Sequence, residues 1–455
     1  MKIFLLACAA LGAGLSASPS FAGPLHDGIG APEPLKIRAI VRSRTEAIDG
    51  QFRPAKAEND FLQSFRSQLL IEYDAGPLRI GAELIDVRGY GQKDASSVGT
   101  GEVNALELSQ AYLGFDLGNA LGAGSKSSVN VGRYVLAINS KRLMDGAGSR
   151  NTVNAHTGAF IDWKHENDKF VAFWSMPHNR LPDDPASIRN NKVEWDLETT
   201  DIQFWGASFT KGALLGEGTV ELYAYGLAER DSANRPTTNR RLFTPGGRAF
   251  REPAKGKLDF DIEAAYQFGH IRASKAPTDR ADLDVSAWFT HAEVGRTFAA
   301  AWAPRLSVHF DLATGDGRKP HTYNRFDALY GSRRSDFGPI GLYGPISRSN
   351  LVSGGLRFDV EPTDRLDVFV MARTLWLQNS TDSFGSTGVR DRTGGSARHA
   401  GTQAEARVRY WMVPKVIRLD TGIAHLSKGR FLTDAPNAPT TGNTNYAYLD
   451  MIFEF

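Results

Sequence analysis

The 455-residue chain is close to charge balance, with a formal net charge of +2, and its mean hydropathy is -0.32. These values exclude a membrane protein built from apolar helices, since only the N-terminus contains a long apolar run. The length would suit about three soluble domains or one large β-barrel. The 46 glycines and 10% aromatic residues favour many strands separated by turns.

Residues 1–22 are predicted to be a secretory signal peptide. Lys2 supplies a positive start, an apolar core runs from Ile3 to Leu15, and Ala22 ends a cleavage pattern of small residues. Cys8 is the one cysteine and lies inside this core, and a lipoprotein signal is the weaker alternative because little apolar sequence precedes it. From residue 23 onward the chain has no cysteine for disulfides, thiol chemistry or a thiolate-bound metal. We expect residues 23–34 to form a short periplasmic segment and residues 35–455 to form the barrel.

Beyond residue 34, apolar and polar residues alternate in segments of about 10–14 residues, the pattern of strands with two different faces. In the clearest segment, residues 259–269, Phe260, Ile262 and Phe268 share one face, while Asp261 and Glu263 share the other. Residues 305–315 repeat the pattern. Alternation alone does not separate a soluble sandwich from a barrel whose apolar faces contact lipid.

Three features favour a membrane barrel. The segments match the roughly 9–11 residues that a tilted strand needs to cross a bilayer. Short connections, such as residues 75–77, 166–168, 362–364 and 413–415, alternate with long ones, such as 177–199, 316–347, 380–399 and 429–441. The chain also ends on an alternating strand with a terminal Phe455, which resembles the recognition signal of outer-membrane barrels.

We therefore predict an all-β fold, a transmembrane antiparallel β-barrel of about 18 strands with short periplasmic turns and long extracellular loops. The strands are expected to begin near residues 35, 61, 78, 104, 128, 157, 169, 200, 217, 240, 257, 282, 305, 348, 365, 400, 416 and 444. The predicted location is the cell outer membrane, where the chain would contact lipid and lipopolysaccharide and depend on the barrel assembly machinery.

Several motifs, in order along most of the mature chain, resemble those of the alginate export porin family. The most specific are the run with Gly132-Arg133, Lys141-Arg142-Leu143 and Arg150-Asn151, and the run from Glu263 to Gly269. Further matches lie at residues 240–248, 314–316, 327–330, 398–401, 405 and 422–426. Tyr134 departs from the family, which usually has Gln there. The resemblance implies an eighteen-stranded barrel whose Arg-rich lumen carries a polyanionic polysaccharide.

Guanidinium groups suit such a path because they stay charged and donate paired hydrogen bonds to carboxylates. The candidate path residues are Arg38, Arg42, Arg44, Arg66, Arg133, Arg142, Arg150, Arg240, Arg241 and Arg248, and the candidate lumen acids are Asp162, Asp261 and Glu263. The alternative for each arginine is structural, because porin lumens are polar throughout and an Arg–Glu pair can simply brace the wall. Arg133, Arg142 and Arg150 lie on the family motif and are the preferred candidates.

The predicted function is a passive channel for an anionic, alginate-like polysaccharide, and the alternative is a general anion, oligosaccharide or organic-acid uptake porin. A periplasmic secretion or uptake complex is a possible partner, and nucleic acid is not expected in a secreted protein. No cofactor or metal site is expected, because the histidines lack ligand spacing and no nucleotide-binding loop or catalytic motif occurs. An outer-membrane enzyme and a secreted glycan-binding β-protein are the rival hypotheses.

Overall fold

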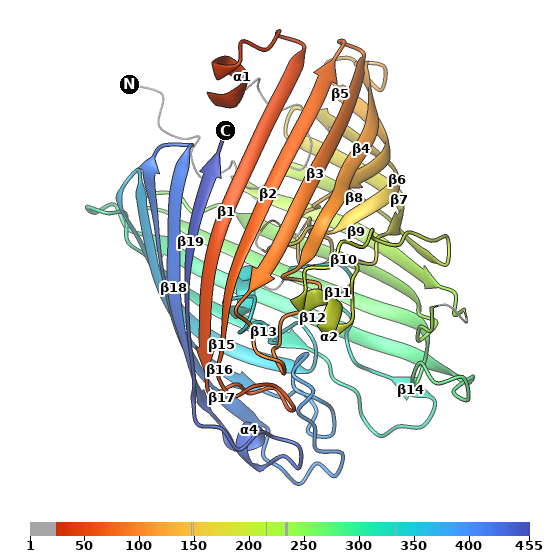
Figure 1. Ribbon diagram of the computed structural model, residues 1–455, viewed down its shortest axis with the longest axis vertical. Coiled ribbons are helices and arrows are strands. Elements are labelled where there is room, and N and C mark those ends of the chain that lie inside the picture. The colour runs from red at the N-terminus through yellow and green to blue at the C-terminus, as the bar shows by residue number, and fades with distance from the viewer. Residues whose placement is uncertain (1–23, 147, 149, 215, 233–234, 333) are drawn as a thin grey trace.

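The computed structural model describes residues 24–146, 148, 150–214, 216–232, 235–332 and 334–455, so the predicted signal peptide lies outside the described residues. One antiparallel sheet curls into a closed barrel (Figure 1). Closure is made by the first strand, β1 (Leu35–Asp49), pairing antiparallel with the last, β19 (Thr444–Glu454). A two-residue strand, β14 (Thr322–Tyr323), adds parallel to β12 from within a loop, and the other eighteen strands form the wall.

The predicted fold is confirmed, and each wall strand begins within three residues of its predicted start. The wall strands between β1 and β19 are β2 (Asp60–Asp74), β3 (Leu78–Tyr90), β4 (Asn104–Gly118), β5 (Lys126–Val135), β6 (Ala155–His165), β7 (Asp168–Pro177), β8 (Ile202–Leu214), β9 (Gly218–Glu229), β10 (Arg241–Arg251), β11 (Leu258–Arg272), β12 (Asp282–Thr297), β13 (Arg305–Ala313), β15 (Leu351–Thr363), β16 (Leu366–Trp376), β17 (His399–Val413) and β18 (Ile417–Lys428). The short helices are α1 (Pro24–Gly28), α2 (Pro185–Arg189), α3 (Arg334–Phe337) and α4 (Arg430–Asp434). Of the helices in the described residues, none has the length and apolar character needed to cross a membrane.

The strands turn their apolar faces outward, as predicted for a barrel in lipid. On β11, Ile262 is 48% exposed and Phe268 is 42% exposed, whereas Glu263 and Gln267 of the opposite face are buried. The same alternation holds on β13, where Val308 is exposed and Asp311 is buried. This orientation excludes a soluble sandwich, in which the apolar faces would pack on each other.

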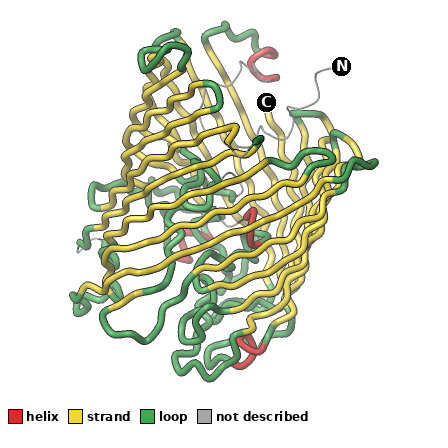
Figure 2. Tube along the Cα trace, turned by 180° about the vertical axis from the view of Figure 1, so that it is seen from behind, coloured by secondary structure: helices red, strands yellow, loops and turns green. Residues whose placement is uncertain are grey.

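Short and long connections lie at opposite ends of the barrel (Figure 1). Short turns follow β2, β6, β15 and β17, at residues 75–77, 166–167, 364–365 and 414–416. The chain's C-terminus and α1 lie at the same end of the barrel. The long connections include residues 136–154, 178–201, 314–350 and 377–398. Loop segments are visible inside the ring of strands when the barrel is seen from behind (Figure 2).

Glycines in the wall make room for inward tyrosines on neighbouring strands. In each case a Cβ on the glycine would lie within 2.7 Å of the ring of the tyrosine paired with it across the strands. Such aromatic cover over a strand glycine fixes the register of a curved sheet. The pairs are Gly81 with Tyr112, Gly206 with Tyr225, Gly246 with Tyr223, and Gly422 with Tyr448.

Candidate functional site

Two long loops enter the lumen, the interior space enclosed by the eighteen wall strands. Residues 336–350 of the loop between β13 and β15 are buried almost throughout, although they belong to no wall strand. The Glu46 carboxylate accepts a hydrogen bond from the Leu342 amide at 3.1 Å, and the Tyr446 hydroxyl donates to the Ile340 carbonyl at 3.2 Å. Residues 336–346, called here the constriction segment, therefore narrow the lumen against β1 and β19.

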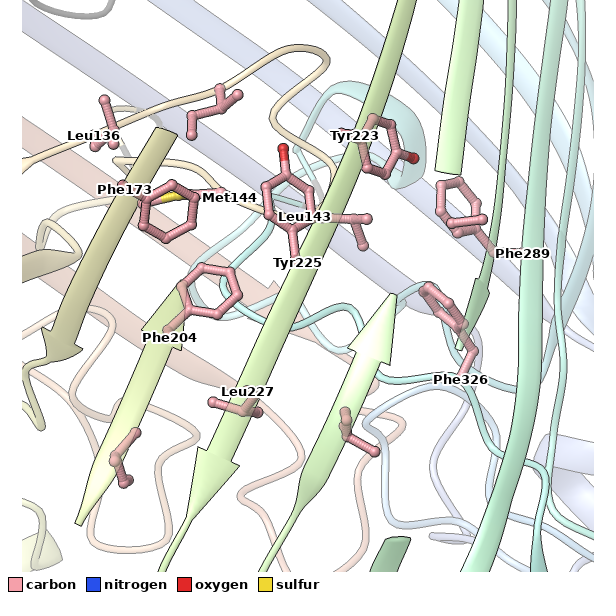
Figure 3. Close-up of a cluster of buried hydrophobic side chains, with 14 of the residues drawn as sticks. Leu136, Leu143, Met144, Phe173, Phe204, Tyr223, Tyr225, Leu227, Phe289 and Phe326 are labelled. Carbon is pink, nitrogen blue, oxygen red and sulfur yellow. The ribbon is translucent and has the colours of Figure 1, made fainter. Parts of the chain in front are cut away.

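The second loop, residues 136–154, is held by an apolar cluster on one side of the lumen (Figure 3). Leu143 and Met144 of this loop pack with inward aromatic side chains from the wall, among them Phe173, Phe204 and Tyr225. Phe326 of the first loop joins the same cluster and lies 5.0 Å from Phe289, centroid to centroid. Burial of this much aromatic surface fixes both loops to the wall strands.

Arg142 links both loops to the wall. Its guanidinium contacts Glu263 at 2.7 Å, Asp261 at 3.0 Å and Asp336 at 2.9 Å, and it is buried. Burial alone would lower its pKa, but Asp261 and Glu263 hold the pKa of Arg142 above its ordinary value. Glu263 also accepts a hydrogen bond from the Tyr223 hydroxyl at 2.7 Å. Three predicted site residues therefore lie in one ion cluster that ties loop to wall.

The same cluster includes a group of possible metal ligands, His291, Asp311 and Asp336, whose ligand atoms lie within 4.8 Å of one another. Asp336, however, is already paired with the guanidinium groups of Arg142 and Arg348. His291 is hydrogen-bonded to Asp311 at 2.7 Å through Nδ1. Two neighbouring positive charges oppose a cation here, so we interpret the group as an ion-pair network.

Across the lumen, arginines form a lateral row on four adjacent strands, β18, β19, β1 and β2. Arg418 pairs across the strands with Ile452, Ile452 with Arg42, and Arg42 with Arg66. Arg42, Arg66 and Ile452 are buried on the inward face. The row is thus a band of three guanidinium groups at one height of the wall, and we call it the arginine row.

The members of the arginine row differ in their partners. Asp450 accepts two hydrogen bonds from Arg42, at 3.0 and 2.7 Å, and also pairs with Arg44 at 2.6 Å. Arg66 donates to the Arg150 carbonyl at 3.1 Å, and Arg418 lies 5.1 Å from the Trp411 ring centroid. Within the described part of the chain, Arg66 and Arg418 form no ion pair with a carboxylate, and the Nε atom of each is buried without a hydrogen-bond partner.

Other predicted residues line different parts of the lumen. Arg248 pairs with Asp261 at 2.7 Å and Arg240 with Asp327 at 2.6 Å, which places both near the inserted loops. Asp162 lies 3.7 Å from Lys169 of the neighbouring strand. Arg38 is more open, with 59% of its side chain exposed and Glu454 at 3.9 Å. The backbone carbonyl of Arg150 also accepts from Arg42 at 2.9 Å, so this loop reaches β1 and β2.

Two predicted path residues do not face the lumen. On β5, Tyr134 points inward, whereas Arg133 shares the outward face with the exposed Val131. The Arg133 guanidinium pairs with Glu107 at 2.7 Å and with Glu198 at 3.6 Å. On β10, Leu242 points inward, so its neighbour Arg241 points outward, and 57% of the Arg241 side chain is exposed. The predicted inward orientation of both arginines was therefore wrong. Successive residues of a strand point to opposite faces, so an error of one residue reverses the face.

Several inward arginines were missed in the sequence. Arg357 and Arg407 both lie over the Phe369 ring, at 4.0 and 4.8 Å, and Arg409 pairs with Asp420 at 3.2 Å. Arg305, Arg348, Arg373 and Arg418 also belong to this set. In the sequence, Arg407 and Arg409 alternate with Val408 and Tyr410, so a signal existed for those two. Arg348 lies in a loop, where alternation carries no information.

The comparisons with known proteins agree with this geometry. The sequence profile described as alginate export matches residues 34–444. The chain belongs to the alginate export family. Among curated proteins, none matches the sequence significantly.

Solved proteins of Pseudomonas aeruginosa, among them the outer membrane protein opdK, have the same fold. They include opdK (TM-score 0.56, 12% identity, covering 92% of this chain and 98% of that chain) and OccK8 (OprE) (0.55, 11%, 93% and 98%). A third is OccK2 (OpdF), solved in complex with glucuronate (0.54, 11%, 92% and 98%). The family and the closed eighteen-stranded barrel identify this chain as an outer-membrane channel rather than an enzyme.

Proposed function

We propose that this member of the alginate export family conducts carboxylate-bearing sugars, with an alginate-like polyuronate as the first candidate. The observation that carries the proposal is the arginine row, in which Arg66 and Arg418 have no carboxylate partner among the described residues. A buried polar group without a partner costs free energy, so such groups are usually satisfied by a ligand or water. A carboxylate of the solute would supply the missing acceptor.

The position of the row supports this proposal. The wall opposite the aromatic cluster carries Arg418, Arg42 and Arg66 on neighbouring strands, and both inserted loops reach this wall, through the Arg150 carbonyl and the constriction segment. Positive charge in a low-dielectric wall raises the local concentration of anions. The solute path therefore follows β18, β19, β1 and β2. The fold relative OccK2 was solved with glucuronate, which has the same carboxylated-sugar chemistry.

Uptake of small anionic sugars or organic acids is the second candidate. It is favoured by the constriction segment, because residues 336–346 are buried inside the barrel and occupy part of the lumen beside β1 and β19. A segment that occupies part of the lumen favours small solutes over a polymer.

The test is ion selectivity in planar bilayers. Replacing Arg66 and Arg418 together by Gln should move the reversal potential in a KCl gradient toward the value of a cation-selective channel. It should also weaken block by uronic-acid oligomers. The matched control is Arg230→Gln, because Arg230 has 75% of its side chain exposed and pairs with Asp201 outside the row. Unchanged reversal potential and unchanged block in the double variant would rule out the row as the solute site.

A further inference from the structure

The β5–β6 hairpin is shorter than the strands on either side of it, because its connection, residues 136–154, turns into the lumen. Pairing of β4 with β5 stops at Ala111, although β4 begins at Asn104. Pairing of β6 with β7 stops at Pro177, where β7 ends. At the long-loop end of this hairpin the ladder of wall strands is therefore interrupted. We call the space between the start of β4 and the end of β7 the wall gap.

The contacts of Arg133 show that the wall gap passes through the sheet. Its side chain starts on the outward face of β5, yet its guanidinium donates to the Glu107 carboxylate and to the Leu108 carbonyl, both at 2.7 Å. Leu108 belongs to the part of β4 that extends past the pairing with β5. Glu107 is paired with the buried Ile85 of β3 and shares its inward face. An outward arginine thus reaches an inward carboxylate, a contact that a continuous sheet would block.

Residues 193–197 of the loop between β7 and β8, called here the bridging segment, cross the wall gap. Val193 forms a parallel bridge with Ala105 of β4, and Leu197 forms an antiparallel bridge with Asn179, just after β7. Two backbone hydrogen bonds join Leu197 and Asn179, at 2.9 and 3.0 Å. These directions are those of a strand in the place of β6, which runs parallel to β4 and antiparallel to β7. Helix α2, earlier in the same loop, lies beside β3 (Figure 1).

The bridging segment alternates like a wall strand. Val193, Trp195 and Leu197 are exposed. Asp196, between the last two, is buried. Successive residues of an extended segment point to opposite faces, so the three apolar side chains share the outer face. Trp174 is an exposed, outward residue of the adjoining strand β7. The apolar stripe of the bridging segment therefore continues the outward apolar face of the barrel.

Polar contacts on the inner side hold the bridging segment in place. The Asp196 carboxylate accepts a hydrogen bond from the Asn104 side chain at 3.0 Å, and the Asp196 amide donates to the Glu107 carboxylate at 2.6 Å. Asn191, just before the segment, forms two hydrogen bonds with the backbone of Gly89 on β3, at 2.8 and 2.9 Å. The segment is thus joined to the wall strands by its polar side, and its apolar stripe points away from the barrel.

We propose that the bridging segment is a part of the barrel wall that closes the wall gap and contacts the acyl chains of the outer leaflet. Its stripe is joined to β4 and β7, whose outward faces already contact lipid, so lipid is the partner that continuity assigns to it. A contiguous apolar stripe marks an interaction surface, and its transfer from water into acyl chains is favourable. The inference goes beyond the proposed channel function and does not depend on which solute the barrel conducts.

The experiment places a fluorescent label on the apolar stripe in lipid vesicles. The mature chain is predicted to have no cysteine, so Trp195→Cys introduces a single thiol. Lipids with a nitroxide near the top of the acyl chain should quench this label severalfold more strongly than aqueous iodide does. Ala186→Cys is the matched control, because it lies on α2 of the same loop, is exposed and should show the reverse order. Quenching of both labels by iodide alone would overturn the inference. Lipid quenching that disappears as the protein-to-lipid ratio rises would also overturn it, since a second copy of the chain would then cover the stripe.

A second measurement tests closure of the wall gap. Ala105 is fully buried beside the bridging segment, so the thiol of Ala105→Cys should react slowly with a lipid-soluble maleimide. Adding Asp196→Ala removes the hydrogen bond to Asn104 and should make the reaction severalfold faster. Both proteins are compared as refolded, heat-modifiable barrels, which separates opening of the gap from failure to fold. Equal reaction rates in the two folded barrels would show that the segment does not close the gap.

Discussion

Asp450 balances two guanidinium groups of the neighbouring strand. Arg42 binds it through two hydrogen bonds and Arg44 through a third contact at 2.6 Å, and all three side chains are buried. Arg44 also pairs with Glu46 and donates to the Tyr446 hydroxyl at 2.8 Å. This cluster lies at the seam between β1 and β19, where the barrel closes.

Neutralising Asp450 should therefore weaken the seam. We expect Asp450→Asn to lower the free energy of unfolding by about 3–5 kcal/mol, because it leaves two buried arginines short of a counter-charge. The measurement is urea unfolding of the barrel reconstituted in lipid vesicles. Asp162→Asn is the control and should cost less than about 1 kcal/mol, since its pair with Lys169 is longer and more exposed. Equal effects of the two variants would contradict the role given to Asp450.

At the level of single elements, strand β10 depends on the absence of a side chain at Gly246. A Cβ there would lie 2.5 Å from the Tyr223 ring, and Tyr223 is the residue that holds Glu263 beside Arg142. The glycine therefore connects wall packing with the ion cluster that attaches the loops. Gly354 on β15 is the opposite case, because an added Cβ meets no heavy atom within 4 Å.

Gly246→Ala should destabilise the barrel by about 1–3 kcal/mol through overpacking. Gly354→Ala should be neutral or slightly stabilising, because it only restricts the unfolded chain. Thermal unfolding of both variants, followed by circular dichroism, checks the ranking. A stable Gly246→Ala barrel would show that the ring can move without cost.

Strands were the most predictable elements because the period of two is a local property of the sequence. Lipid on one side and water on the other impose the alternation directly, which is why residues 259–269 and 305–315 could be placed with the correct face outward. The predicted face was wrong for Arg133, which follows an irregular pairing, and for Arg241, although its strand pairs regularly with β9. The register of β3 with β4 shifts near Leu84, and the face of Arg133 on the next strand could not be settled from its neighbours alone.

The inserted loops were not predictable, because their placement depends on contacts between residues distant in sequence. Arg142 meets Asp336 across 194 positions, and nothing near either residue indicates the other. Long connections were predicted between the correct strands, but the entry of two of them into the lumen was not predicted. Asp261 and Glu263 were predicted as lumen acids, whereas their contacts with Arg142 became visible only in the folded barrel.

For the whole molecule, closure depends on the last residues of the chain. The Phe455 amide donates to the Ala39 carbonyl at 2.8 Å, and the Ala39 amide donates to the Phe455 carbonyl at 2.9 Å. These two hydrogen bonds extend the β1–β19 ladder to the short-turn end of the barrel. A barrel in lipid has no free edge, since unpaired backbone groups there find no water.

Deleting Phe455 should therefore act on the closed barrel itself, lowering its thermal unfolding midpoint and the heat-modifiable fraction on gel electrophoresis after refolding into vesicles. Phe455→Leu keeps both backbone hydrogen bonds, so its refolded barrel should behave like the parent in vitro. If Phe455 also serves as an assembly signal, Phe455→Leu should reduce the amount of barrel in cells despite normal refolding. A deletion that refolds as well as the parent would show that the seam is held by the other pairs of β1 and β19, with the arginine and Asp450 cluster as the main contributor.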